Sequence, residues 1–191
     1  MRRYFLVSVL AILLLASCTT TAVRSEQYLS SGTALLQQGK GEEAISEFDK
    51  GLLKDKANPK LLYNKAVALS SLGRTEEART IAHSAFALYP QHLRFLLLEA
   101  QCYRLEGKAG EAIYLYEQEL SLNPADDTTR LDLMNYALTE GYTETARNQA
   151  NWFLTYKKHQ SEAYAALAKL DGAGSLSEEI SNYLTAHPVK N

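Results

Sequence analysis

The chain has 191 residues, which is enough for one globular domain or a short repeat array. Its apolar content of 46% and charged content of 22% are typical of a packed globular protein and exclude wholesale disorder. The net charge of −2 provides no basic excess for binding nucleic acid. With 10 Gly, 4 Pro and 2 Cys, the chain favours neither a loop-rich β architecture nor a disulfide framework.

Residues 1–17 have the organisation of a signal peptide. Two arginines follow Met1, and the apolar run 4–16 spans roughly 20 Å as a helix, less than the ~30 Å of a hydrocarbon core. The run ends in Leu15-Ala16-Ser17-Cys18, which resembles the lipobox of bacterial lipoproteins. The resemblance implies that Cys18 becomes the mature N-terminus, with a diacylglycerol on its thiol and an acyl chain on its amine. An uncleaved anchor or a secreted protein without lipid is the alternative.

Acylation of Cys18 would place the protein at the cell envelope. Several acyl chains, at ~0.8 kcal/mol per buried CH₂, hold a protein on a membrane almost permanently. An Asp after the lipidated Cys retains enterobacterial lipoproteins in the inner membrane, and this chain has Thr19 there. We therefore expect the periplasmic face of the outer membrane if the organism has one, and otherwise the outer leaflet of the cytoplasmic membrane. Residues 18–24 then form the lipidated Cys and a short tether.

The rest of the chain has a period of 34 residues. Glycines recur at this spacing, and an alanine follows each glycine five residues later: Gly39, Gly73, Gly107 and Gly141, with Ala44, Ala78, Ala112 and Ala146. A 34-residue period with Gly at a helix end and a small residue early in the next helix resembles the tetratricopeptide repeat (TPR). In this register the units are 25–58, 59–92, 93–126 and 127–160, which together form the repeat region 25–160.

The resemblance implies an all-α fold, a TPR solenoid of antiparallel helix hairpins. Residues 161–191 continue the register with Tyr164, then predict a loop at 171–175 and a second helix at Leu176–Ala186. We interpret this segment as a shortened fifth hairpin that caps the stack, because terminal repeats face water on one side. A solvated helix pair outside the stack is the alternative.

Two repeat positions depart from the family pattern in an informative way. The first aromatic position holds Tyr28, Leu62, Leu96 and Arg130, so the fourth unit departs outright. The large position of the second helix alternates between large and small residues: Phe48, Ala82, Tyr116 and Ala150. This alternation predicts compensating volumes along the stack, while small residues elsewhere let the two helices of a hairpin approach closely.

The sequence does not predict an enzyme. It contains no His-Glu-x-x-His, Cys-x-x-Cys, Gly-x-Ser-x-Gly or phosphate-binding glycine loop. Paired acids such as Glu42-Glu43 and Glu76-Glu77 stand at the starts of second helices, where the helix dipole favours them. Cys102 lies within a predicted helix and is expected to be a buried, inert thiol. We expect no metal and no cofactor apart from the acyl groups on Cys18.

In TPR proteins the first helices of successive hairpins line a peptide-binding groove. By this resemblance the candidates are Leu29, Thr33 and Leu36; Lys60, Tyr63, Asn64, Val67 and Ser70; Arg94, Leu97, Leu98, Gln101 and Arg104; and Leu131, Asp132, Asn135 and Leu138. An apolar floor with amides and a few cations suits a peptide better than a small polar metabolite. Any single candidate can instead be an ordinary packing or solvated residue. Only Asn64 and Arg94 match the clamp with which co-chaperone TPRs hold a C-terminal carboxylate.

These observations predict a membrane-anchored TPR lipoprotein that acts as a protein–protein adaptor or scaffold in bacterial cell-envelope assembly or transport. Its partner is expected to be another envelope protein that is itself membrane-associated, because the tether is short. The alternative is a lipid-anchored TPR protein that delivers a small hydrophobic molecule to a transporter.

Overall fold

The computed structural model describes residues 25–172, 182–183 and 185–186, and every regular element in these ranges is a helix. The predicted all-α fold is confirmed. The predicted signal peptide, Cys18 and the tether lie outside the described residues, as does most of the predicted helix Leu176–Ala186. No helix in the described ranges has the length and hydropathy needed to cross a membrane.

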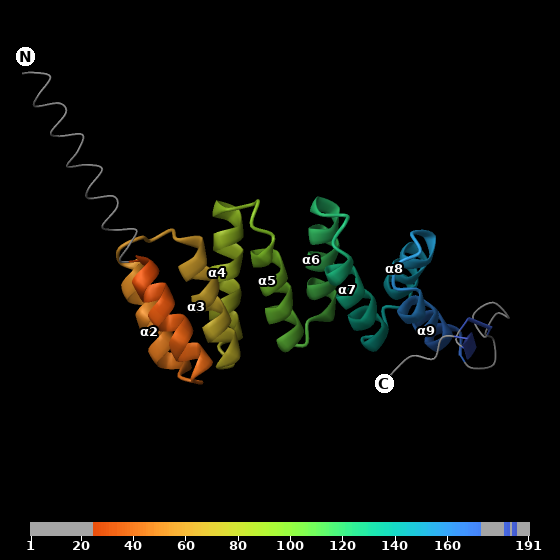
Figure 1. Cartoon of the computed structure of the whole chain (residues 1–191), viewed down its shortest axis with the longest axis horizontal. Helices are drawn as coiled ribbons and strands as arrows, with labels where there is room; N and C mark the ends of the chain where they lie inside the picture. The colour runs from red at the N-terminus through yellow and green to blue at the C-terminus, as the bar shows by residue number, and fades with distance from the viewer. Residues whose placement is uncertain (1–24, 173–181, 184, 187–191) are drawn as a thin grey trace, which may run out of the picture. The chain divides into compact units, whose positions relative to one another are not determined.

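Residues 25–37 are helical and precede the helices labelled in Figure 1. Those helices are α2 (Gly41–Leu52), α3 (Pro59–Ser71), α4 (Thr75–Leu88), α5 (Arg94–Leu105), α6 (Ala109–Leu122), α7 (Asp127–Thr139), α8 (Thr143–Thr155) and α9 (Gln160–Asp171). The chain divides into two compact units, an N-terminal unit (Met1–Glu106) and a C-terminal unit (Gly107–Asn191). The boundary falls between α5 and α6, the two helices of the predicted repeat 93–126.

The repeated glycines stand in the turns between helices and have left-handed backbone angles. Gly39, Gly73, Gly107 and Gly141 have φ of +74°, +78°, +71° and +80°. In the turn before α4, the amide of Gly73 donates to the carbonyl of Ser70 (3.0 Å) and the amide of Arg74 to that of Leu69 (2.9 Å). A Cβ is unfavourable at such a φ, so the turn explains why glycine recurs with the period.

Side-chain caps fix the starts of two first helices. Asn58 accepts from the amides of Lys60 (3.1 Å) and Leu61 (3.2 Å), and Pro59 occupies the first turn of α3. At α7, Oδ1 of Asp126 accepts from the amides of the second and third helical residues, both at 3.0 Å. These caps satisfy amides that have no partner inside the helix, and so they set where each helix begins.

Within the N-terminal unit, α3 packs against α2, α4 and α5, and α4 packs against α5 (Figure 1). The core includes Phe48, Leu61 and Leu69, all almost fully buried. A Cβ placed on Gly32 would lie 2.3 Å from Cε1 of Phe48. This contact confirms that a small residue in the first helix lets the large residue of the second helix approach.

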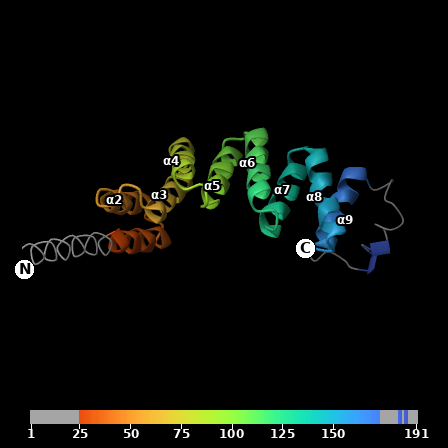
Figure 2. The same cartoon turned by 90° about the horizontal axis from the view of Figure 1, so that it is seen from above.

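Within the C-terminal unit, α7 packs against α6, α8 and α9, and α8 packs against α9 (Figure 2). Met134, Phe153 and Leu167 are buried together. The rings of Tyr164 and Tyr183 have centroids 4.3 Å apart, so the segment after α9 contacts α9 at this point.

Candidate peptide-binding surface

The first helices of the N-terminal unit carry most of the predicted groove residues. On α3, the spacing i, i+3, i+4, i+7 places Lys60, Tyr63, Asn64 and Val67 on one side of the helix. Ring and ion-pair contacts from this side reach residues 25–37 and α5. We call this surface of the N-terminal unit the first-helix face, and its members are Leu29, Thr33, Leu36, Lys60, Tyr63, Asn64, Val67, Arg94, Leu97, Gln101 and Arg104.

Arg94 and Tyr63 form the centre of the first-helix face. The guanidinium carbon of Arg94 lies 4.9 Å from the centroid of the Tyr63 ring, a cation–π distance. The Tyr63 ring meets the fully buried ring of Phe95 edge-on, with centroids 6.0 Å apart. Arg94 itself is exposed, and no carboxylate of the described chain pairs with it. A buried ring therefore orients Tyr63, and Tyr63 holds a cation whose N–H groups stay at the surface.

The aromatic contacts continue into the segment before α5. His92 lies between two rings, with centroids 5.7 Å from Tyr89 and 6.4 Å from Phe95. The hydroxyl of Tyr89 donates to the carbonyl of Ala57, which precedes α3. These contacts connect the N-terminal ends of α3 and α5, the helices that carry Tyr63 and Arg94.

Other polar members of the first-helix face make local hydrogen bonds. Thr33 donates to the carbonyl of Leu29 (2.7 Å), and the Asn64 amide donates to that of Lys60 (2.8 Å). Lys60 pairs with Glu26 at 2.6 Å, but both side chains are more than half exposed. Exposed pairs of this kind contribute little to stability, so the Lys60–Glu26 pair opens at small cost when a competing carboxylate binds.

The apolar members are half-buried. Leu29, Leu36 and Val67 pack against the core of the N-terminal unit while part of each side chain reaches the surface. Leu98 differs, because it is 3% exposed and belongs to that core. Its assignment to the groove is wrong: α5 turns Leu98 inward and leaves its neighbour Leu97 half-buried.

The predicted groove residues of α7 belong to the C-terminal unit and comprise two leucines and two polar residues. Leu131 and Leu138 pack against the core of that unit. Asp132 and Asn135 are exposed, and the hydroxyl of Thr139 donates to the Asn135 carbonyl (2.9 Å). No ring or cation–π contact is present among these residues of the described chain.

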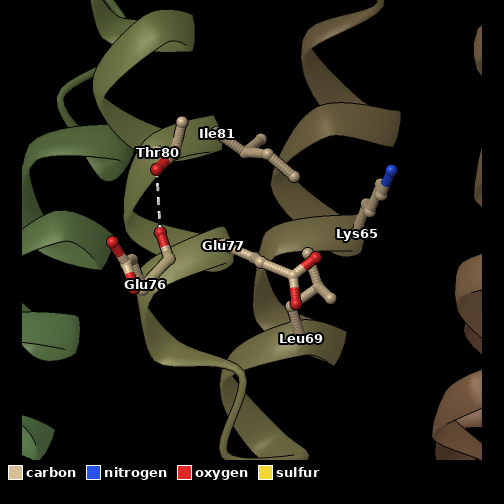
Figure 3. Close-up of a pocket in the computed structure, with 6 residues that line it drawn as sticks. All are labelled: Lys65, Leu69, Glu76, Glu77, Thr80 and Ile81. Carbon is tan, nitrogen blue, oxygen red and sulfur yellow. Dashed lines mark hydrogen bonds between the residues drawn. The ribbon is translucent and has the colours of Figure 1, made fainter.

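An open pocket of about 420 Å³ lies between α3 and α4, lined by Lys65, Leu69, Glu76, Glu77, Thr80 and Ile81. Figure 3 shows Ile81 and Glu77 of α4 pointing toward α3. Lys65 and Leu69 follow Tyr63 by two and six residues, about 200° and 240° further round a helix of 3.6 residues per turn. The pocket is therefore on the opposite side of α3 from the first-helix face.

Two charged residues of this pocket form ion pairs, Lys65 with a neighbouring helix and Glu77 with the residue before its own helix. Lys65 bonds Asp49 of α2 at 2.6 Å, and Arg74 bonds Glu77 at 2.7 Å. The hydrogen bond and charge of Arg74 lower the pKa of the Glu77 carboxyl. Because Lys65 and Glu77 already have partners, this pocket is a weaker candidate for binding than the first-helix face.

Cys102 and the acidic residues give no sign of a reactive centre in the described part of the chain. Cys102 is fully buried, and burial raises the pKa of its thiol, which disfavours the nucleophilic thiolate. Across residues 25–172 and the short described segments after them, no three His, Cys, Asp or Glu side chains gather in a way that could hold a metal ion.

Sequence reasoning missed a buried polar cluster in the C-terminal unit. Arg130, identified only as a departure from the aromatic position, stacks on Trp152 with its guanidinium carbon 3.9 Å from the ring. Glu119 is buried nearby. Glu119 stands out in the sequence as the one charged residue at its repeat position, because the positions 34 residues apart hold Gly51, Ala85 and Phe153.

The comparisons with known proteins agree with the repeat. Residues 35–102 match the sequence model of the tetratricopeptide repeat family. A search of curated proteins found no significant match.

Among solved structures, MamA from Desulfovibrio magneticus is 17% identical with a TM-score of 0.68, covering 85% of this chain and 92% of that one. A TPR protein from Parabacteroides merdae is 18% identical with a TM-score of 0.64, covering 87% and 66%. The first TPR of Spaghetti (RPAP3), solved with the HSP90 peptide SRMEEVD, is 26% identical with a TM-score of 0.55, covering 60% and 90%.

These structures share the fold along most of the described chain. Tetratricopeptide repeats are typically non-enzymatic modules that present an extended surface to other proteins. Residues 35–102 are tetratricopeptide repeats, and the all-α fold of the chain is that of a tetratricopeptide-repeat solenoid.

Proposed function

We propose that this protein is a lipid-anchored TPR adaptor of the bacterial cell envelope, and that its first-helix face binds a segment of a protein partner. The observation that carries the proposal is the Arg94–Tyr63 pair. It offers an exposed guanidinium without a carboxylate partner in the described chain, held at 4.9 Å over a ring that a buried phenylalanine orients. Anchored Arg and Tyr side chains are the residues that most often dominate protein–protein binding.

The surroundings of Arg94 indicate the chemistry of the bound segment. Val67 and Leu97 are half-buried members of the first-helix face, and the Asn64 side-chain amide donates to the carbonyl of Lys60, which leaves its oxygen as an acceptor. A guanidinium recognises a carboxylate through two parallel hydrogen bonds, and an amide recognises a peptide backbone. The face therefore suits an extended segment that carries an acidic side chain next to apolar ones.

The solved complex of RPAP3 offers a partial parallel, since that protein binds an acidic HSP90 peptide. The present chain retains Asn64 and Arg94 at clamp positions but has Leu29, Thr33 and Leu98 at the others. Leu98 is also buried, so it contributes nothing at the surface. We therefore expect an internal acidic segment of the partner rather than a free C-terminal carboxylate.

The anchor is proposed from the lipobox Leu15-Ala16-Ser17-Cys18. A diacylglycerol and an acyl chain on Cys18 would be followed by the six residues 19–24, which extend at most about 21 Å. The repeats would then lie close to the bilayer, on the periplasmic face of an outer membrane where one exists and otherwise on the outer leaflet of the cytoplasmic membrane. A partner within reach would itself be membrane-associated.

Site-specific photocrosslinking in native membranes tests the binding proposal. A photoreactive phenylalanine analogue replaces Gln101, which is exposed on α5, or Glu76, which is exposed on α4 near the pocket. We expect one envelope protein to crosslink from position 101 and not from position 76. The product should disappear in the Tyr63→Ala, Arg94→Ala variant and persist in Tyr63→Phe, which keeps the ring. Crosslinking from position 76 alone, or an unchanged product in the double variant, would move the site off the first-helix face.

Acylation is tested separately. Cys18→Ala should abolish labelling by radiolabelled palmitate and release the protein from membranes, while Cys102→Ala should leave both unchanged. Labelling that survives Cys18→Ala would rule out the anchor without bearing on the binding surface. A native mass spectrum that shows a bound small molecule and no protein partner would instead favour the carrier of a hydrophobic ligand.

A further inference from the structure

Two charged residues replace apolar or small ones where α6 meets α7. Glu119 of α6 stands 34 residues after Ala85 and 68 after Gly51, and Arg130 of α7 stands at the equivalent of Leu96. Both are inside the C-terminal unit, where α6 and α7 pack together. At the two equivalent positions, the other described repeats have uncharged residues.

Glu119 is buried with little to stabilise its charge. The residue is 1% exposed, and Oε2 has no hydrogen-bond partner in the described structure. Oε1 accepts only from the side-chain amide of Asn123, at a long 3.4 Å. Removing a carboxylate from water without hydrogen bonds strongly disfavours its ionised form.

Arg130 is close to Glu119 but directs its donors elsewhere. One guanidinium nitrogen donates to Gln149 (2.7 Å), another donates to the carbonyl of Pro124 (3.1 Å), and the plane stacks on Trp152. Its Nε finds no partner in the described residues. Arg130 therefore contributes a diffuse positive charge to the junction and no direct ion pair with Glu119.

The remaining charged groups around the junction do not neutralise Glu119. Asp126, at the start of α7, adds a second negative charge, and Asp127 pairs with Lys158 at 2.7 Å. Tyr156 of the segment after α8 faces Arg130. Burial and then Asp126 raise the pKa of the Glu119 carboxyl, and the opposing effects of Asn123 and Arg130 are smaller.

We propose that Glu119 is a proton-binding site of the α6–α7 junction, and that uptake of the proton as the pH falls stabilises the junction. The direction follows from linkage. A carboxyl that binds protons more strongly in the folded than in the unfolded chain makes folding more favourable as the pH falls toward its unfolded value of about 4.3. The ionised form destabilises the junction at neutral pH. This dependence is opposite to that of carboxylates in ion pairs, which lose their contribution in acid.

Unfolding by denaturant at several pH values tests the proposal, with Trp152 fluorescence as the readout. Trp152 is the only tryptophan of the chain and touches Arg130, so it reports on the C-terminal unit. Glu119→Gln imitates the protonated carboxyl. Glu117→Gln, at an exposed position of α6 two residues before Glu119, is the matched control.

We expect Glu119→Gln to move the unfolding midpoint to higher denaturant at pH 7.5 and to match the wild type at pH 4. Glu117→Gln should follow the wild type throughout. A Glu119→Gln midpoint that is lower at pH 7.5, or a displacement that is the same at every pH, would overturn the proposal.

A direct titration of the wild-type protein does not depend on the variant. Carbon-13 NMR of labelled glutamate carboxyls, assigned through the backbone, should show Glu119 taking up its proton at a pH above the unfolded value of about 4.3. Titration of Glu119 at or below that value would equally overturn the proposal.

Discussion

The two units each hold an arginine over an aromatic ring, and they use the pair differently. In the N-terminal unit, exposed Arg94 lies 4.9 Å from the centroid of Tyr63. In the C-terminal unit, Arg130 lies 3.9 Å from that of Trp152, is 7% exposed and bonds Gln149 and Pro124. The N–H donors of Arg94 stay at the surface, whereas those of Arg130 bond groups inside the fold.

Burial therefore decides what the same pair does. At the surface, water solvates the guanidinium, and a carboxylate can replace that water with two charge-assisted hydrogen bonds. In the interior the cation has lost its water, so every donor that finds no partner is costly and the surrounding groups must hold it in place. The exposed pair suits recognition and the buried pair suits architecture.

The largest expected difference between the pairs is in stability. Arg130→Ala should lower the free energy of unfolding by roughly 3 kcal/mol, since it removes two charge-assisted hydrogen bonds inside the fold and exposes Trp152. Arg94→Ala should change it by no more than about 0.5 kcal/mol, as for most surface substitutions. Denaturant unfolding followed by circular dichroism and Trp152 fluorescence measures both. Equal costs for the two variants would erase the distinction between a structural and a recognition arginine.

Two helical glycines provide the next comparison. Gly32→Ala should lower the free energy of unfolding by ~1–3 kcal/mol, because the new Cβ would lie 2.3 Å from the buried ring of Phe48. Gly110→Ala in α6 meets only the hydroxyl of the half-exposed Tyr142, at 3.3 Å. It should be neutral or gain up to about 1 kcal/mol from helix propensity. Thermal unfolding of the two variants checks the sign, and a stable Gly32→Ala would count against close packing of the first hairpin.

The two helix caps should differ in cost although each accepts from the second and third backbone amides of its helix. Asn58→Ala should lower the free energy of unfolding by ~1 kcal/mol, because it removes the hydrogen bonds from the first amides of α3. Asp126→Ala loses the equivalent bonds of α7 but also removes a negative charge close to Glu119. We therefore expect its net cost at pH 7.5 to be the smaller, and to approach that of Asn58→Ala at pH 4. Chemical unfolding at both pH values measures the difference, and identical costs at pH 7.5 would argue against repulsion at the α6–α7 junction.

The smallest effect is expected at the exposed pair of Lys60 and Glu26. Lys60→Met should change the free energy of unfolding by less than about 0.5 kcal/mol, with no dependence on salt beyond that of the wild type. The measurement is denaturant unfolding at low and high ionic strength. A loss above 1 kcal/mol would mean that the Lys60–Glu26 pair is structural and does not open for a partner's carboxylate.

Periodicity was sufficient to predict the all-α fold, because the repeat depends on local backbone rules. A left-handed turn needs glycine, so Gly39, Gly73, Gly107 and Gly141 mark the helix ends in the sequence itself. Small positions and large positions were likewise visible in the register, and the close approach of Gly32 and Phe48 in the structure is one instance. The groove candidates came from the same register, and the structure brings Lys60, Tyr63 and Arg94 into contact with residues of neighbouring helices.

What periodicity could not decide is which side chains meet across helices. Leu97 and Leu98 are adjacent on α5, and only the packing of α3 and α4 against α5 determines that Leu98 is the buried one. In the sequence, Arg130 is only a departure from the repeat pattern. In the structure, α8 places the ring of Trp152 against its guanidinium.

The sequence by itself therefore determined the period, the helix ends and the composition of each helix face, since these follow from backbone dihedral angles and residue size within one turn. The tertiary structure alone decided that Arg94 stays exposed while Glu119 and Arg130 are buried. Burial depends on the distance and crossing of helices far apart in the chain, and no local pattern encodes it.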